Sequence, residues 1–283
     1  MSHAILVTGA PGGTQGSTGR LVTSLLLEQG IPVRALVHKL DSRSDELRQQ
    51  GAEVAEGLLE AATISAAAAR EAALELVVNN SQFQGRPGDP EFRDLKRTAS
   101  FRNGQHRLAD RIFDWARVGA VHLQAPPYYE NLRALFSRSV AEQSTVFLPW
   151  GEDTTVIPLV GAQDVSRVAA ALLTTPGVPS QSAYALVGEN PTVGEMTEAP
   201  GNAIGRPIRY VAITDEQWAN AAKERLGPHA VDHPAHLWQT FRKGEERYQS
   251  TDAIRTVTGR NPQTLEEFFR ENAGFFAAST REA

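Results

Sequence analysis

The stretch that most limits the possible folds lies at the start of the chain. Ala4–Thr8 is an apolar run of strand length, the eleven residues 9–19 include five glycines, and residues 21–29 place apolar pairs four apart, like one face of a helix. Glycine takes positive φ and has no Cβ, so this backbone can approach a pyrophosphate, which the dipole and N–H groups of the next helix would hold. A glycine loop without a ligand is the alternative, but its place between strand and helix favours a nucleotide.

The residues predicted to hold the nucleotide here are those of the turn and of the start of the helix. The spacing Gly13-x-x-Gly16-x-x-Gly19 is that of one dinucleotide-binding variant, and Gly9 stands where the strand ends. The full predicted set is Gly9, Gly13, Thr14, Gln15, Gly16, Ser17, Thr18 and Gly19.

The segment after a second predicted strand, residues 32–37, bears on the choice of cofactor. An NAD-binding unit places an acidic residue near the end of this strand to bind the adenosine ribose, whereas an NADP-binding unit has basic groups there. Here His38 and Lys39 follow the strand, with Arg34 within it and Arg43 just beyond, and Asp41 is the one competing carboxylate. We therefore predict NADP(H), with a solvated basic loop as the alternative.

Composition excludes several classes of function. The 283 residues contain no cysteine, which rules out disulfides, thiolate catalysis and cysteine-based metal sites, and a formal net charge of −5 argues against nucleic acid or an anionic membrane as partner. No apolar stretch approaches the roughly 18 residues of a membrane helix, so a soluble, cytoplasmic protein is expected. A small-molecule substrate is the expected partner, and a homodimer is left open. No metal is predicted, because no carboxylate motif beyond Asp232 accompanies His229, His233 and His236, which are interpreted as solvated histidines.

Strands and helices are predicted to alternate up to Trp150 and less regularly beyond it. We expect an α/β fold, a Rossmann-type doubly wound parallel sheet with a smaller, mostly helical C-terminal substrate region. The predicted domains are residues 1–150, which bind the dinucleotide, and residues 151–283, of which 151–175 return partly to the first domain. Capping boxes at Thr192, Thr214 and Thr264 predict helix starts, and Pro200 with Gly201 is expected to interrupt the first of these helices.

Several blocks, taken in order, resemble the NmrA-like branch of the atypical short-chain dehydrogenase/reductases over nearly the whole chain. The blocks are VTGAPGGTQGSTGRLV, VRALVHKLDS, QQGAEVAEG, LVVNNSQ, the helix around HRLAD, LQAPPYYENL, LVGAQDVSRVAAALLTTP and AIGRPIRYVAIT. Members of this family include NADPH-dependent quinone and dye reductases and redox-sensing regulators. The resemblance implies a Rossmann domain with a C-terminal region closing over the nicotinamide, and it places Ser81 and Gln82 beside that ring.

The chain departs from the family near Ala69, where relatives carry a further strand and the beginning of a helix. Either the protein lacks this strand or the sequence omits a segment here. The omission is favoured, because deleting a central strand would leave buried backbone groups unpaired.

The chemistry expected from the resemblance is hydride transfer from NADPH to a conjugated or aromatic acceptor. The Tyr-x-x-x-Lys pair usual in the wider superfamily is absent. His106, which matches a functional lysine of isoflavone-type reductases, is the candidate proton donor, and Tyr128 is a second catalytic candidate. Gln84, Tyr129 and Asn131 are expected near the substrate, although both tyrosines are equally compatible with packing. The alternative function is a non-catalytic NADP(H) sensor that acts through a protein partner.

Overall fold

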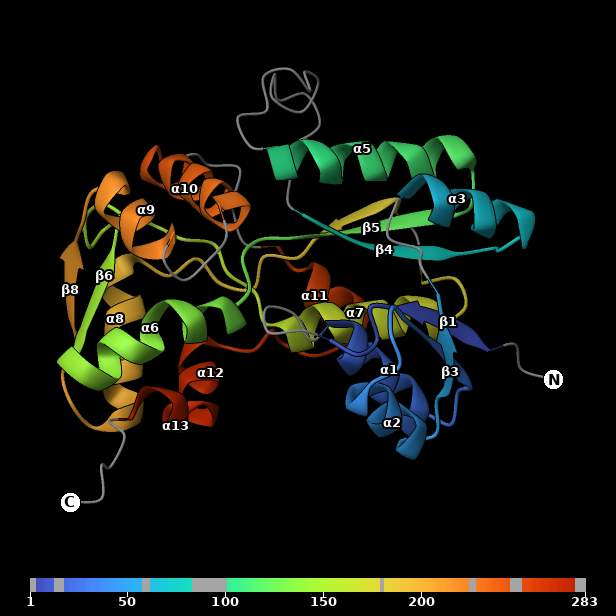
Figure 1. Cartoon of the computed structure of the whole chain (residues 1–283), viewed down its shortest axis with the longest axis horizontal. Coiled ribbons are helices and arrows are strands. Elements are labelled where there is room, and N and C mark those ends of the chain that lie inside the picture. Colours follow the sequence, from blue (N-terminus) through green and yellow to red (C-terminus); the bar gives the residue numbers. More distant parts are fainter. Residues whose placement is uncertain are drawn as a thin grey trace.

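The computed structural model describes residues 4–12, 18–57, 62–82, 101–178, 181–223, 228–244 and 251–277. These residues form two lobes that lie side by side along the longest axis of the molecule (Figure 1). One lobe contains parallel strands with helices on both faces, and the other is mainly helical. None of the helices in these ranges is long and apolar enough to cross a membrane.

The N-terminal strands form a three-stranded parallel sheet in the order β1-β2-β3. The strands are β1 (Ile5–Thr8), β2 (Val33–Val37) and β3 (Glu53–Glu56), and they are connected by α1 (Thr18–Glu28) and α2 (Ser42–Gln49). The β-α-β unit predicted from the opening stretch is thus confirmed. Helix α1 buries Val22 and Leu26 in the same core as Val33 and Ala35 of β2, as its four-residue apolar spacing predicts.

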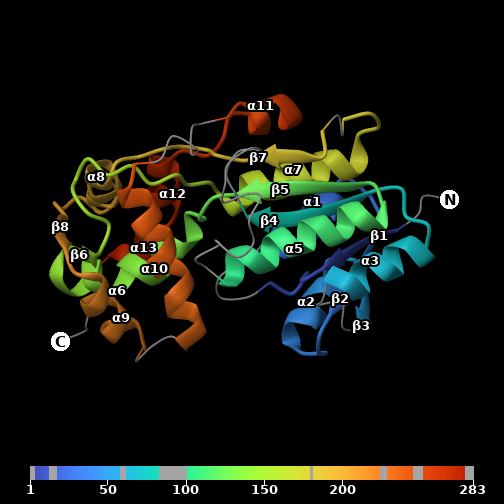
Figure 2. The same cartoon turned by 90° about the horizontal axis from the view of Figure 1, so that it is seen from above.

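A second three-stranded parallel sheet has the order β4-β5-β7, and Figure 2 shows these strands side by side. The strands are β4 (Val77–Gln82), β5 (Ala120–Ala125) and β7 (Ala183–Ala185). Helices α3 (Ala62–Glu71) and α5 (Phe101–Ala116) cover one face of β4 and β5, while α7 (Ala162–Thr174) lies on the other (Figure 1).

Within the described chain, no ladder joins β1 to β4, so the strand layer is divided where the family resemblance places a further strand. The helix layers continue across this division, because α1 packs on α7 and α3 packs on α5. One core also includes side chains from both halves, such as Val7 and Leu123. Leu6 of β1 is 44% exposed, which is unusual for a strand that is central in doubly wound sheets.

The second lobe is assembled from both the middle and the end of the chain. Its elements are α6 (Glu130–Gln143), β6 (Thr145–Leu148), α8 (Val193–Ile204), β8 (Arg209–Ala212), α9 (Asp215–Lys223), α10 (Pro228–Arg242), α12 (Leu265–Glu271) and α13 (Ala273–Phe276). Helix α11 (Ala253–Thr258) instead packs on α7 of the first lobe. The core of the second lobe is rich in aromatic rings, including Phe136, Trp150 and Phe269.

Two expectations from the sequence differ from these observations, and one feature of the fold was not predicted. Residues 129–150, expected in the first domain, contribute to the core of the second lobe from Tyr129 onward. Helix α8 continues through Pro200, because its buried face of Val193, Met196 and Ala199 outweighs one lost backbone hydrogen bond. The parallel pair β6-β8 was not predicted, whereas all three capping boxes are present.

Candidate functional site

The turn after β1 and the start of helix α1 lie so close together that there is no room for a side chain at Gly19. Gly9 has φ +66° and its carbonyl accepts the Gly12 N–H at 3.1 Å. A Cβ built on Gly19 would lie 2.6 Å from the Gly9 carbonyl oxygen and 3.0 Å from that of Thr8, so only glycine fits there. The start of α1 therefore points at the end of β1, the arrangement that binds a pyrophosphate at a helix N-terminus. The candidates Gly13, Thr14, Gln15, Gly16 and Ser17 lie outside the described residues.

The loop after β2 extends toward this turn. His38 and Lys39 are exposed, and the Arg43 guanidinium donates from Nη1 to the Gly12 carbonyl at 3.3 Å. Arg43 also forms an ion pair with Asp41, at 2.6 Å between Nη2 and Oδ2, and this hydrogen bond lowers the pKa of Asp41. Asp41, the carboxylate that competed with the NADP interpretation, is the N-cap of α2.

Arg34 does not lie in this loop. It pairs in register with Leu6 near the start of β2 and forms an ion pair with Glu53 of β3 at 2.9 Å. The position of Arg34 therefore gives no support to its predicted role in cofactor binding.

Successive side chains at the end of β4 contact different elements, as the alternation of a strand requires. Ser81 is buried and its hydroxyl donates to Asp110 of α5, with 3.0 Å between Oγ and Oδ2. Asn80 Oδ1 accepts from the Tyr128 hydroxyl at 3.1 Å, and the Gln82 amide lies 3.4 Å from Nε2 of His233 on α10. Ser81 and Gln82, both expected to contact the cofactor, thus contact α5 and α10 respectively.

Tyr128 joins the end of the second sheet to the start of α1. Its hydroxyl interacts with the side chain of Thr18 as well as with Asn80. Burial raises the pKa of the Tyr128 phenol, which stays protonated near neutral pH and donates its hydrogen bond to Asn80. Of the two tyrosines in this segment, Tyr128 is the one that lies between the glycine turn and the end of β4.

Tyr129 is a core residue, which corrects the expectation that it contacts the substrate. It is fully buried, stacks on Phe268 with 5.5 Å between ring centroids, and donates its hydroxyl to Glu189 at 2.9 Å. Burial raises the pKa of Tyr129 far above its ordinary value, with the Glu189 carboxylate contributing. A side chain enclosed in this way has no surface left for an acceptor.

The remaining predicted residues lie on α5, on α6 and outside the described residues. His106 is half-buried on α5, one turn before Asp110. Asn131 lies in the first turn of α6, where its backbone N–H donates to the Tyr128 carbonyl at 3.0 Å. Gln84 lies outside the described residues.

A buried polar group between β4, β5 and α5 was missed at the sequence level. Asn79 Nδ2 donates to Asp110 Oδ1 at 2.8 Å, and His122 of β5 places Nδ1 3.4 Å from the same oxygen and Nε2 3.0 Å from Asp114 Oδ1. Burial raises the pKa of Asp110, although the nearby His122 opposes this rise. The sequence did contain a signal for this buried group, because Asn79 and His122 are polar residues within otherwise apolar strand sequences.

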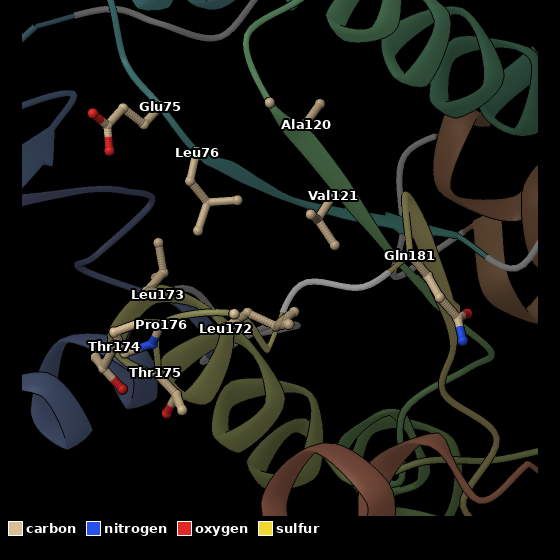
Figure 3. A pocket seen from close by; sticks show the side chains of 12 residues that line it. Glu75, Leu76, Ala120, Val121, Leu172, Leu173, Thr174, Thr175, Pro176 and Gln181 are labelled. Carbon is tan, nitrogen blue, oxygen red and sulfur yellow. The ribbon is translucent and has the colours of Figure 1, made fainter.

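A cavity of about 700 Å³ lies at the opposite end of the second sheet. Leu76, just before β4, and Val121, near the start of β5, point toward Leu172 and Leu173 near the end of α7 (Figure 3). Ligands of open α/β sheets bind beyond the carboxyl ends of the strands, so this cavity is not the candidate cofactor site.

Comparison with known proteins finds similarity over nearly the whole length of the chain. No protein-family model matches the chain. An NAD(P)H azoreductase of Xenophilus azovorans is 26% identical over 296 aligned positions, covering 95% of this chain and 98% of the relative. This alignment is longer than the chain itself, so the relative carries residues that have no counterpart here.

Two solved structures share the fold. The NADP(H) complex of Citrobacter sp. triphenylmethane reductase has a TM-score of 0.75 and 16% identity over 95% of this chain and 100% of its own. The NADPH complex of an NADPH-dependent quinone oxidoreductase of Escherichia coli also has a TM-score of 0.75 and 16% identity, over 95% and 99%. The named relatives are NAD(P)H-dependent reductases, in agreement with the resemblance stated from the sequence, and the two solved structures share the fold of this chain.

Proposed function

We propose that this chain is an NADPH-dependent oxidoreductase that transfers a hydride to a small conjugated or aromatic acceptor, such as a quinone, an enone, a carbonyl or an azo compound. The observation that carries the proposal is the alignment with an NAD(P)H azoreductase over nearly the full length of both chains. The close approach of Gly19 to Gly9 supports it, because that approach has a physical reason in dinucleotide binding.

The residues proposed to hold NADPH lie at the carboxyl edge of the first sheet. Gly9, Gly19 and the first turn of α1 would bind the pyrophosphate, together with residues 13–17 between them. His38, Lys39 and Arg43 would bind the 2′-phosphate, since charged donors recognise phosphate best. The loop is suited to this because Arg43 already contacts the turn through the Gly12 carbonyl.

The acceptor is proposed to lie beyond the end of β4, near Gln82, Tyr128 and His106. Bound NADPH supplies the hydride. The side chains would then position the acceptor and supply a proton, for which His106 on α5 and the neutral phenol of Tyr128 are the proposed donors. Helix α10 would border the same space, because its His233 lies beside Gln82.

The first experiment measures NADPH oxidation by the purified protein with a panel of quinones, enones, azo dyes and cationic triphenylmethane dyes. Turnover with at least one of these acceptors is expected. Firm NADPH binding without turnover would overturn the reductase in favour of the sensor, whose partner would then have to bind differently in the presence of NADPH and NADP. The same proposal includes a cytoplasmic location, which cell fractionation tests. It also includes a homodimer, which light scattering tests.

A further inference from the structure

The hydroxyl of Tyr128 joins two elements that lie on either side of the divided strand layer. It donates to Asn80 Oδ1 on β4, with 3.1 Å between the two oxygens, and it also contacts the side chain of Thr18, the first residue of α1. An amide oxygen only accepts hydrogen bonds, so the single phenol proton goes to Asn80 and the phenol oxygen accepts from the Thr18 hydroxyl. We call Thr18, Tyr128 and Asn80 the tyrosine bridge.

The tyrosine bridge crosses the division of the strand layer at its carboxyl edge. Strand β1 pairs with β2, strand β4 pairs with β5, and no ladder among the described residues joins β1 to β4. In an undivided sheet, backbone hydrogen bonds would fix the end of β1, and the helix that follows it, relative to the end of β4. Here the tyrosine bridge makes this connection, together with the packing of α1 on α7, where Ser166 Oγ lies 3.3 Å from the Thr18 carbonyl oxygen.

Tyr128 is itself held in place by the backbone on both sides of it. The Tyr129 N–H donates to the Val160 carbonyl at 3.0 Å, and the Val160 N–H donates to the Pro127 carbonyl at 3.2 Å. Val160 is fully buried, and Tyr128 packs against the core that contains it. The Tyr128 ring is therefore a fixed point, and a shift of α1 or of β4 away from it would cost a hydrogen bond.

We propose that Tyr128 and Asn80 are positioning residues that hold the start of α1 in the orientation that binds the dinucleotide pyrophosphate, an inference that rests on the proposed function. Gly9, Gly19 and the first turn of α1 are the groups proposed to bind the pyrophosphate, and Thr18 belongs to this turn. A helix start that is already held in its binding orientation loses less conformational freedom when the ligand binds, so the affinity is higher.

The same geometry bears on whether Tyr128 donates a proton to the acceptor. Its one hydroxyl proton is directed at Asn80, so donation to an acceptor would break the tyrosine bridge in each turnover. Positioning through the tyrosine bridge needs the Asn80 amide, whereas proton donation needs only the phenol. Removing the Asn80 side chain therefore separates the two roles that the Tyr128 hydroxyl could have.

The test measures NADPH and NADH affinities by calorimetric titration in Tyr128→Phe, Asn80→Ala and the double variant. Each single variant should bind both cofactors about threefold to tenfold more weakly, because the two cofactors share the pyrophosphate and one ordinary hydrogen bond is lost. The double variant should bind no more weakly than Tyr128→Phe, since both substitutions remove the same bond. The matched control is Tyr184→Phe, which loses a hydroxyl bonded to the Val178 carbonyl at 3.2 Å and should bind both cofactors like wild type.

Circular dichroism verifies that each variant is folded, and Asn80 is exposed, so its replacement disturbs no core. Unchanged affinities in folded Tyr128→Phe and Asn80→Ala, or additive losses in the double variant, would overturn the proposal. A fall in kcat in Tyr128→Phe alone, with both affinities unchanged, would also overturn it and make the phenol a proton donor.

The choice of two cofactors locates the effect within the dinucleotide. A loss confined to NADPH would assign the effect to the 2′-phosphate and would contradict a role at the pyrophosphate. A wild type that binds neither cofactor would instead overturn the proposed function, and the positioning role with it.

Discussion

Glu130, the first residue of α6, accepts a hydrogen bond from the backbone N–H of Ala162, the first residue of α7, with 3.1 Å between Oε2 and N. The N-cap of α7 is Gly161, which has no side chain to fill this role. Glu130 thus caps α7 from a distance, and its negative charge suits the helix N-terminus. Because α6 packs in the second lobe and α7 in the first, this contact also joins the lobes.

Replacing Glu130 with Ala should lower the free energy of unfolding by about 1 to 3 kcal/mol, because the buried Ala162 N–H loses its partner. Urea denaturation measures this change. Glu142→Ala is the matched control on the same helix, where an exposed ion pair with Arg138 should contribute about 1 kcal/mol or less. Equal losses in the two variants would show that the cap does not stabilise the protein.

The pH dependence of stability should reflect the same carboxyl. Burial raises the pKa of Glu130, while its bond to Ala162 and the charge of Arg133 oppose the rise and Asp164 adds to it. Since the folded pKa exceeds the unfolded one, the group's contribution to stability is present below the unfolded pKa and is lost as pH rises through the folded pKa. Glu130→Gln keeps an oxygen for Ala162 and should remove this loss. Unfolding free energies of wild type and Glu130→Gln, measured from about pH 4 to 7, test this expectation. Identical slopes of free energy against pH in the two proteins would show that Glu130 is not the group responsible.

Gly19→Ala should weaken NADPH binding at least about tenfold, because its Cβ would lie 2.6 Å from the Gly9 carbonyl oxygen and push α1 away from the turn. Gly274→Ala is the control, since nothing lies within 4 Å of a Cβ at that helical position. Calorimetric titration with NADPH gives the affinities, and circular dichroism verifies folding. Unchanged affinity in a folded Gly19→Ala protein would remove the turn from the cofactor site.

Lys39→Ala should weaken NADPH but leave NADH binding unchanged, because a charge-assisted contact to the 2′-phosphate is lost, at a cost of about 1.5 to 3 kcal/mol. Arg34→Ala serves as the control, as Arg34 forms its ion pair with Glu53 instead. Titration of each variant with both cofactors decides the matter. A wild type that binds NADH as tightly as NADPH would show that the basic loop is merely solvated.

Local patterns in the sequence account for the parts of the fold that were predicted correctly. The β1-turn-α1 unit and the capping box at Thr264 depend on residues within a few positions of one another, so their spacing determines them. The pairing of β6 with β8 joins Thr145 to Arg209 across a long sequence separation, which short-range periodicity does not report. The division of the strand layer between β1 and β4 was indicated by the family resemblance and not by local spacing, because relatives carry a further strand near Ala69 that is not found in this sequence.

The site was predicted only where backbone conformation carries the signal. Gly19 could be found because its lack of a side chain is the requirement itself. Tyr128 and Tyr129 could not be distinguished, since neighbouring residues look alike in sequence and only the packing around Phe268 and Glu189 buries the second. The buried group of Asn79, Asp110 and His122 was missed because His122 meets Asp110 through the packing of α5 on β5, which no local motif encodes.

His106 provides the prediction that separates positioning from proton donation. It lies on α5 one turn before Asp110, at the end of the helix that faces the carboxyl edge of β4 through Ser81. If His106 donates the proton, His106→Ala should lower kcat for a neutral acceptor by about a hundredfold and leave NADPH affinity unchanged. A change confined to KM would make it a positioning residue. If neither kcat nor KM changes in His106→Ala, the half-buried imidazole has no part in the reaction.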